Sequence, residues 1–305
     1  MLTLFVNVVL PVFIVAGIGL VVERTLRPPI APFNQLALYV LMPSLIFTSL
    51  LTVDFRSELP LKITLFALLL AVVMLAIAFV IIRLGRLDRV TGSAFMLTAA
   101  FPNLGNYGLP VVFLAFGNEG LPFALVLLAM QTVYGLTLAI FIASSSNASL
   151  TQALAQVFRQ PLIYAVAAAL VFNLAQIPLP AFLGAALALP SQAAIPVMLM
   201  VLGMQVASSA RIERPGLVAV AVVNRLVVGT LVGWGLTALL GIEGLARDVM
   251  IVGSAMPTAV FTTLTATQFD ARPRFVSNVV VAGTLASIVT VTVVLAILSG
   301  RLSLV

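Results

Sequence analysis

Cysteine and histidine are both absent from the 305 residues of this chain. Without cysteine there is no disulfide and no thiolate ligand for zinc or an iron–sulfur cluster. Without histidine there is no imidazole ligand for a metal or haem and no histidine general base. Most enzyme chemistries therefore have no candidate residues here. We predict that the chain is not an enzyme and that it carries no cofactor, with bound Na⁺ as the one alternative considered below.

Charged residues are also scarce, at 8% of the chain, whereas hydrophobic residues make up 62%. This composition is typical of an integral membrane protein and not of a soluble domain. The net charge is +6, but the basic residues stand singly between apolar runs, so the sequence predicts a lipid bilayer as partner and no nucleic acid. The first apolar run, residues 2–22, lacks a basic leader and a small-residue cleavage motif, which favours a retained membrane span.

The apolar runs indicate about ten spans, each near the length that a helix of 1.5 Å rise per residue needs to cross a bilayer. Their approximate limits are residues 2–22, 30–51, 61–82, 92–117, 121–143, 157–174, 188–207, 217–240, 246–269 and 273–298. The predicted fold is an all-α integral membrane protein. We place a first half at residues 1–143, a linker at 144–158 and a second half at 159–305.

Basic residues are distributed unevenly between the two alternating sets of connections. The richer set contains Arg24, Arg27, Arg83, Arg86, Arg89, Arg159, Arg211, Arg214, Arg272 and Arg274. The poorer set contains Arg56, Lys62, Arg247 and Arg301. Because cytoplasmic loops are enriched in Lys and Arg, we expect the richer set to be cytoplasmic and both termini to be extracytoplasmic. The expected location is the plasma membrane, or the inner membrane of a bacterium.

The most unusual span is the fourth, which contains Pro102, Asn103, Gly105, Asn106 and Gly108 in quick succession. Proline removes a backbone donor and glycine permits conformations that other residues avoid, so a helix should unwind here. Free backbone groups survive in a membrane only when they are buried in protein or line a wet cavity. Half-helix ends at such a break favour an anion at their amino-terminal side. The alternative is a packing kink whose asparagines bond a neighbouring helix.

Proline positions also indicate an internal repeat. Pro43 and Pro196 are 153 residues apart, and Pro102 and Pro257 are 155 apart, so one offset aligns both pairs. An odd number of spans in each half inverts the second repeat relative to the first. We therefore expect two inverted five-helix repeats whose broken spans cross near the bilayer midplane, and we expect the binding site at that crossing.

Three stretches resemble the auxin efflux carrier family, which includes plant auxin exporters and bacterial malonate permeases. They are Pro102-Asn103 with Gly108-Leu109-Pro110, the run from Ala255 to Val260, and Asn224-Arg225-Leu226. The resemblance implies a fold like that of bile-acid and sodium/proton carriers, with spans one, two, six and seven as scaffold and the others as a moving core. It also implies a homodimer, elevator-type alternating access, and an Asn103 that holds a substrate carboxylate.

The predicted substrate-binding residues surround the two breaks. They are Asn103, Asn106, Pro102, Gly105, Tyr107, Pro257, Thr258, Ser44 and Arg225. For several of them a structural role competes: Ser44 can satisfy its own kinked helix, Thr258 can bond back to its own helix, and Tyr107 can form a cavity wall. Arg225 stands inside a span, where it either snorkels to the headgroups or attracts an anion. Gly229 and Gly233 should pack helices closely within the monomer.

All nine acidic residues fall in loops or at span ends, so a proton relay through a buried carboxylate is disfavoured. A sodium site built from amides, hydroxyls and carbonyls stays open, with Asn106, Gln205, Thr262 and Gln131 as candidate ligands. The sequence predicts a secondary or facilitative carrier of a small organic anion. The alternatives are a sodium-coupled carboxylate symporter and a membrane sensor that binds a ligand without transporting it.

Overall fold

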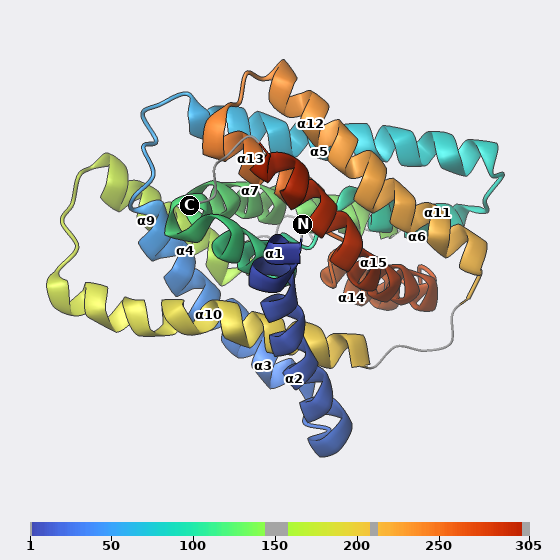
Figure 1. Cartoon of the computed structure of the whole chain (residues 1–305), viewed down its shortest axis with the longest axis horizontal. Helices are drawn as coiled ribbons and strands as arrows, with labels where there is room; N and C mark the ends of the chain where they lie inside the picture. The colour runs from blue at the N-terminus through green and yellow to red at the C-terminus, as the bar shows by residue number, and fades with distance from the viewer. Residues whose placement is uncertain (1, 144–157, 208–212, 301–305) are drawn as a thin grey trace.

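The computed structural model describes residues 2–143, 158–207 and 213–300, and within these ranges the secondary structure is helical (Figure 1). Seven helices in the described part are long and apolar enough to cross a membrane, as expected of an integral membrane protein. They are Phe5–Leu26, Ile30–Leu50, Leu59–Leu84, Leu104–Gly135, Ala181–Val206, Pro215–Leu239 and Pro273–Ser299. Apart from Phe158, the predicted linker lies outside the described residues.

One group of helices lies along the left and bottom of Figure 1 and reaches its centre. Helix α10 packs against α2 and α4, and α4 packs against α9. The group consists of α1 (Leu2–Leu4), η1 (Phe5–Val9), α2 (Leu10–Leu26), α3 (Ile30–Leu36), η2 (Ala37–Leu41), α4 (Met42–Leu50), α9 (Pro161–Leu174) and α10 (Ala181–Ala207), where η marks a π-helical turn.

The second group fills the top and right of Figure 1. Helix α5 packs against α6, α7 and α12, α13 packs against α7 and α12, and α15 packs against α11 and α14. Its members are α5 (Leu59–Leu84), α6 (Arg89–Ala100), η3 (Leu104–Gly108), α7 (Leu109–Ala143), α11 (Pro215–Val223), η4 (Asn224–Val228), α12 (Gly229–Leu239), α13 (Gly244–Ser254), α14 (Phe261–Gln268) and α15 (Pro273–Ser299). Helix α7 contains a non-helical residue, Gly117, with φ of 64°, at the place where the sequence predicts one span to end and the next to follow.

The contact between α2 and α10 depends on two glycines. A Cβ atom at Gly19 would overlap the backbone carbonyl of Met200, and one at Gly203 would overlap that of Ala16. Helix axes can approach this closely only where the side chain is a hydrogen atom. The first group is therefore held together by a backbone-to-backbone crossing that no larger residue fits.

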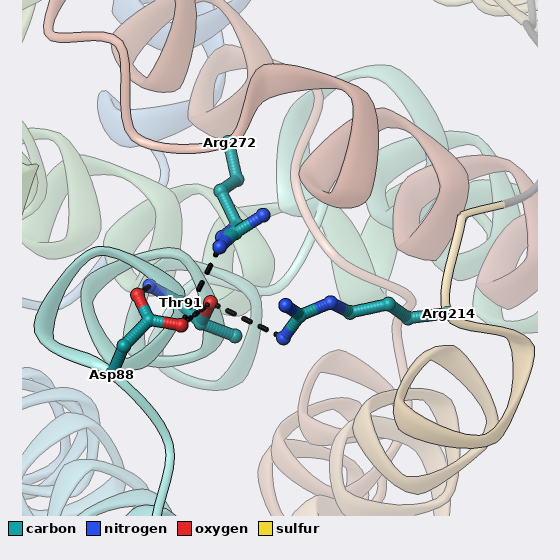
Figure 2. A network of polar contacts seen from close by, with 4 residues as sticks. All are labelled: Asp88, Thr91, Arg214 and Arg272. Atoms are coloured by element: carbon teal, nitrogen blue, oxygen red, sulfur yellow. Dashed lines mark hydrogen bonds and ion pairs between the residues drawn. The ribbon is translucent and has the colours of Figure 1, made fainter.

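Asp88, Arg214 and Arg272 each precede a helix of the second group, and they lie close together around Thr91 (Figure 2). Asp88 precedes α6 and accepts hydrogen bonds from the Thr91 backbone N–H at 3.0 Å and from the Thr91 hydroxyl at 2.6 Å. Arg272, which precedes α15, lies 3.4 Å from the same carboxylate, and Arg214, which precedes α11, donates to the Thr91 hydroxyl. The Thr91 bonds and then the two arginines lower the pKa of Asp88 to about 2.

This network predicts a pH-dependent contribution to stability. Because the pKa of Asp88 is lower in the folded chain than the ordinary value of about 3.9, the unfolded chain binds more protons at acidic pH. The stabilisation should be complete above about pH 4 and lost as the pH falls toward 2. Asn is also a good amino-terminal cap, so Asp88→Asn should keep the bond from the Thr91 backbone N–H and remove the charge together with one acceptor oxygen, at a cost of about 1 kcal/mol for this exposed group.

The measurement is the apparent melting temperature of the two proteins in detergent across this pH range. The wild-type chain should melt higher than Asp88→Asn at pH 5, and the two should converge as the pH falls. A gap that is unchanged down to pH 2 would contradict the assignment of the effect to the Asp88 charge.

Candidate functional site: the crossing of two interrupted helices

The first interruption separates α6 from η3. Helix α6 ends at Ala100, and Phe101 is extended, with φ of −117° and ψ of 102°. The cause is Pro102, whose ring disfavours the helical conformation of the residue before it. The chain resumes a helical path at Leu104 as a π-helical turn. The sequence predicted an unwound segment at this place, and the structure contains it.

The second interruption separates α13 from α14. Helix α13 ends at Ser254, and residues 255–260 run without regular helix until α14 begins at Phe261. Pro257 stands in the middle of this segment and again removes a backbone donor. Both predicted breaks are therefore present, and each leaves one half-helix ending and another beginning inside the protein.

The two unwound segments lie against each other. The Asn103 N–H donates to the Pro257 carbonyl at 2.7 Å, and the Ala259 N–H donates to the Phe101 carbonyl at 2.8 Å. These bonds pair Pro102 with Thr258 in a short antiparallel bridge. Backbone groups that helix breaking would leave unsatisfied thus bond across the crossing.

Glycine and threonine make this close approach possible. A Cβ atom at Gly108 would lie 3.2 Å from Met256 Cγ, so a larger residue would press the two segments apart. The Thr258 hydroxyl is buried and donates to the Thr98 carbonyl at 2.8 Å, in the last turn of α6. Thr258, predicted to contact the ligand, therefore also ties the second break to the first.

Two side-chain amides at the crossing retain unused hydrogen-bonding capacity. Asn103 is 4% exposed, and its Nδ2 has no partner among the described residues. Gln131 of α7 donates through Nε2 to the Pro102 carbonyl at 2.8 Å, while its Oε1 has no partner there. A buried polar group without a partner costs about 1–3 kcal/mol. These amides are therefore suited to receive a polar ligand.

The crossing is less buried at the first turn of η3 than at the unwound segments. Gly105 and Asn106 are half-buried, whereas Pro102, Asn103 and Leu104 are buried. The Gly108 N–H donates to the Asn103 carbonyl, and the N–H groups of Gly105 and Asn106 stand in the first turn, where a helix leaves its N–H groups without an intrahelical acceptor. They form the positive end of a helix. A methyl group of Met198 on α10 would lie 3.9 Å from a Cβ atom at Gly105, so this end faces the first group of helices.

Tyr107 lies beside the crossing and contacts helices of both groups. Its ring meets Phe13 of α2 edge to face, with centroids 5.9 Å apart. Its hydroxyl accepts a hydrogen bond from Ser287 of α15 at 3.0 Å. Tyr107 is fully buried and joins the two groups of helices at this point.

Arg225 lies buried between the ends of two broken helices. Its Nη1 donates to the Ala99 carbonyl at 2.8 Å and its Nη2 donates to the Ser254 carbonyl at 2.6 Å. These acceptors are at the carboxyl ends of α6 and α13. With 1% of its surface exposed, Arg225 does not snorkel toward the headgroups, so that one of the two alternatives is excluded. Since both partners are backbone carbonyls, no side chain in the sequence identifies them.

The two glycines of the Gly-xxx-Gly motif make room for these contacts. A Cβ atom at Gly229 would lie 2.9 Å from Arg225 Cζ, and one at Gly233 would lie 2.5 Å from Ser254 Cβ. The prediction of close packing within the monomer is confirmed.

The remaining predicted residues lie on other elements and bond to other groups. The Ser44 hydroxyl donates to the Val40 carbonyl of its own helix at 2.8 Å, as the kink alternative expects. Thr262 donates to the Ala259 carbonyl at 2.6 Å, and Gln205 Nε2 donates to Asn34 Oδ1 at 3.3 Å. Ser44 borders a shallow groove of about 480 Å³ between α4, α9 and α10.

A larger cavity, of about 520 Å³, lies between the α4–α5 connection and the bend of α7. Asp54, Ser57 and Glu119 are among its lining residues. None of the residues predicted from the sequence lines it.

Comparison with known proteins adds an independent observation. The model of a family described as membrane transport protein matches residues 4–295. An uncharacterized transporter of Methanothermobacter thermautotrophicus is 27% identical over 261 residues, which cover 84% of this chain and 85% of that protein. An uncharacterized transporter of Methanocaldococcus jannaschii is 24% identical over 257 residues, covering 80% and 82%.

Proposed function

Since this chain belongs to the membrane transport protein family, which includes the auxin efflux carriers, we propose that it carries a small organic anion across the bilayer. Malonate and auxin-like carboxylic acids represent the substrate class. The observation that carries the proposal is the buried, unpartnered Asn103 amide beside two unwound segments that bond to each other. An amide N–H in this setting is a donor suited to a carboxylate oxygen.

Helix dipoles favour the same ligand. Each helix amino terminus carries about half a positive elementary charge. Two such ends begin just after the crossing, at η3 and at α14. Asn103 and Asn106 supply side-chain donors beside the first of them, Gly105 lets a ligand approach its backbone, and Thr258 stands on the opposite segment.

Transport follows an elevator mechanism in this proposal. The chain crosses the membrane about ten times in two inverted repeats, with α2, α4, α9 and α10 as scaffold and the second group as the moving core. The packing of the helices into these two groups supports the division. Two scaffolds pair in a homodimer, and the arginine-rich connections face the cytoplasm with both termini outside the plasma membrane.

Voltage alone is sufficient to drive export of an anion. A cell that is negative inside favours the exit of one negative charge by about 2.3 kcal/mol per 100 mV. This corresponds to an equilibrium ratio of about 50.

The test is flux of labelled malonate, succinate and indole-3-acetate in proteoliposomes with an imposed potential. With the inside negative, at least one anion should leave the proteoliposomes faster than it leaves protein-free liposomes. Reversing the potential should reverse the net flux. If none of the carboxylates moves faster than in protein-free liposomes, the proposal is contradicted.

A further inference from the structure

The carboxyl ends of the two broken helices are the natural place for a cation. A helix carboxyl end carries about half a negative elementary charge. In transporters with broken helices, unwound carbonyls and these ends coordinate the coupling ion. Helices α6 and α13 both end at the crossing, at Ala100 and Ser254. Together the two ends present about one negative charge inside the membrane.

Arg225 already fills this place. One guanidinium nitrogen bonds the Ala99 carbonyl and another bonds the Ser254 carbonyl, so a single side chain holds both ends. Its one positive charge equals the sum of the two partial charges that it faces. The planar, multi-donor guanidinium is suited to contacting two acceptors at once.

The partial negative charges of the two helix ends balance the positive charge of Arg225, because no described carboxylate pairs with it. The one fully buried acid among the described residues, Asp248, pairs with Arg247 at 2.8 Å. Gly229 provides the space in which the guanidinium lies. A buried cation of this kind would otherwise be strongly unfavourable.

We propose that Arg225 is a positioning residue that takes the place of a bound cation at the crossing. It neutralises the two carboxyl ends and holds α6 and α13 in register, so that only the positive amino ends of η3 and α14 face the substrate. Anion transport then needs no Na⁺. This inference rests on the proposed function. It adds that Arg225 supplies the positive charge opposite the two helix carboxyl ends.

The direct experiment takes the carboxylate that gives the highest flux and compares its flux in sodium, potassium and choline media. For the wild-type chain the flux should be equal in the three media. Arg225→Ala should lose about tenfold or more in choline, because two hydrogen bonds to charged groups disappear. Sodium or millimolar guanidinium should restore part of that flux, since either cation can enter the emptied place. Arg225→Lys should retain an intermediate flux, and the exposed Arg24→Ala serves as the matched control that should behave as wild type.

A second readout does not depend on transport. In detergent, guanidinium at millimolar concentration should raise the apparent melting temperature of Arg225→Ala and should leave the wild-type chain and Arg24→Ala unchanged. If the wild type moves none of the tested carboxylates, the proposed function fails while this arm still tests the role of Arg225. If Arg225→Ala does not fold, the sodium dependence of the wild type and the behaviour of Arg225→Lys decide. A wild-type flux that requires Na⁺, an Arg225→Ala variant with full flux in choline, or an absence of guanidinium rescue in both readouts would overturn the inference.

Discussion

Replacing Asn103 with alanine should reduce carboxylate transport by about ten- to a hundredfold, the effect of losing one hydrogen bond to a charged group. The fold should remain intact. The backbone bond from Asn103 to Pro257 does not involve the side chain, and the Nδ2 that the substitution removes has no partner in the described structure. Deleting a buried, unsatisfied donor relieves a desolvation cost, so the melting temperature should stay equal or rise.

Two measurements on the same purified protein test this prediction: labelled malonate or indole-3-acetate flux, and thermal unfolding in detergent. Asn103→Asp is the matched variant, because it keeps the size of the side chain but places a negative charge where the substrate carboxylate should sit. It should be at least as inactive as the alanine variant. Full transport by Asn103→Ala, or a loss of activity that follows a loss of folded protein, would contradict the assigned role.

Replacing Gly19 with valine should destabilise the chain by about 3 kcal/mol or more, at the upper end of what overpacking costs. The atoms that a Cβ would meet belong to the backbone of Met200. A side chain can rotate away from a new neighbour, but a helix backbone cannot, so α2 and α10 would have to separate. Because α10 also contacts η3, the position of the scaffold beside the crossing would change as well.

Gly17 provides the control, two residues earlier on the same helix. Nothing lies within 4 Å of a Cβ atom built there, so Gly17→Val makes the same chemical change in open space. The yield of folded protein and its apparent melting temperature should drop sharply for Gly19→Val and stay near wild type for Gly17→Val. Similar behaviour of the two variants would show that the α2–α10 crossing is not as tight as described.

The sequence predicted both helix breaks because each leaves a mark in residue type. Pro102 and Pro257 each remove a backbone donor, and Gly108 permits the contact between the segments. That the breaks meet also followed from the common offset of the prolines. The detailed pairing of the segments did not follow, because backbone bonds such as that from Ala259 to Phe101 carry no signature in the side chains.

The partners of polar side chains were harder to predict for the same reason. Arg225 and Thr258 bond backbone carbonyls of distant helices, so no residue type identified their acceptors. A signal did exist for Arg225. It is a single cation inside a span of a chain with two helix breaks, and each break creates a carboxyl end that attracts a cation. This pattern favours an Arg225 that is bonded to the helix carboxyl ends over one that snorkels to the headgroups.

The central claim is that the crossing is open to water and receives an anion, and the absence of cysteine allows it to be tested directly. Asn106→Cys places the only thiol of the chain at the half-buried first turn of η3. The measurement is its rate of modification by a water-soluble, charged thiol reagent in the presence and absence of the carboxylate that gives the highest flux. The thiol should react, and the carboxylate should slow the reaction. A thiol that never reacts, or that reacts at a rate independent of the carboxylate, would contradict the account.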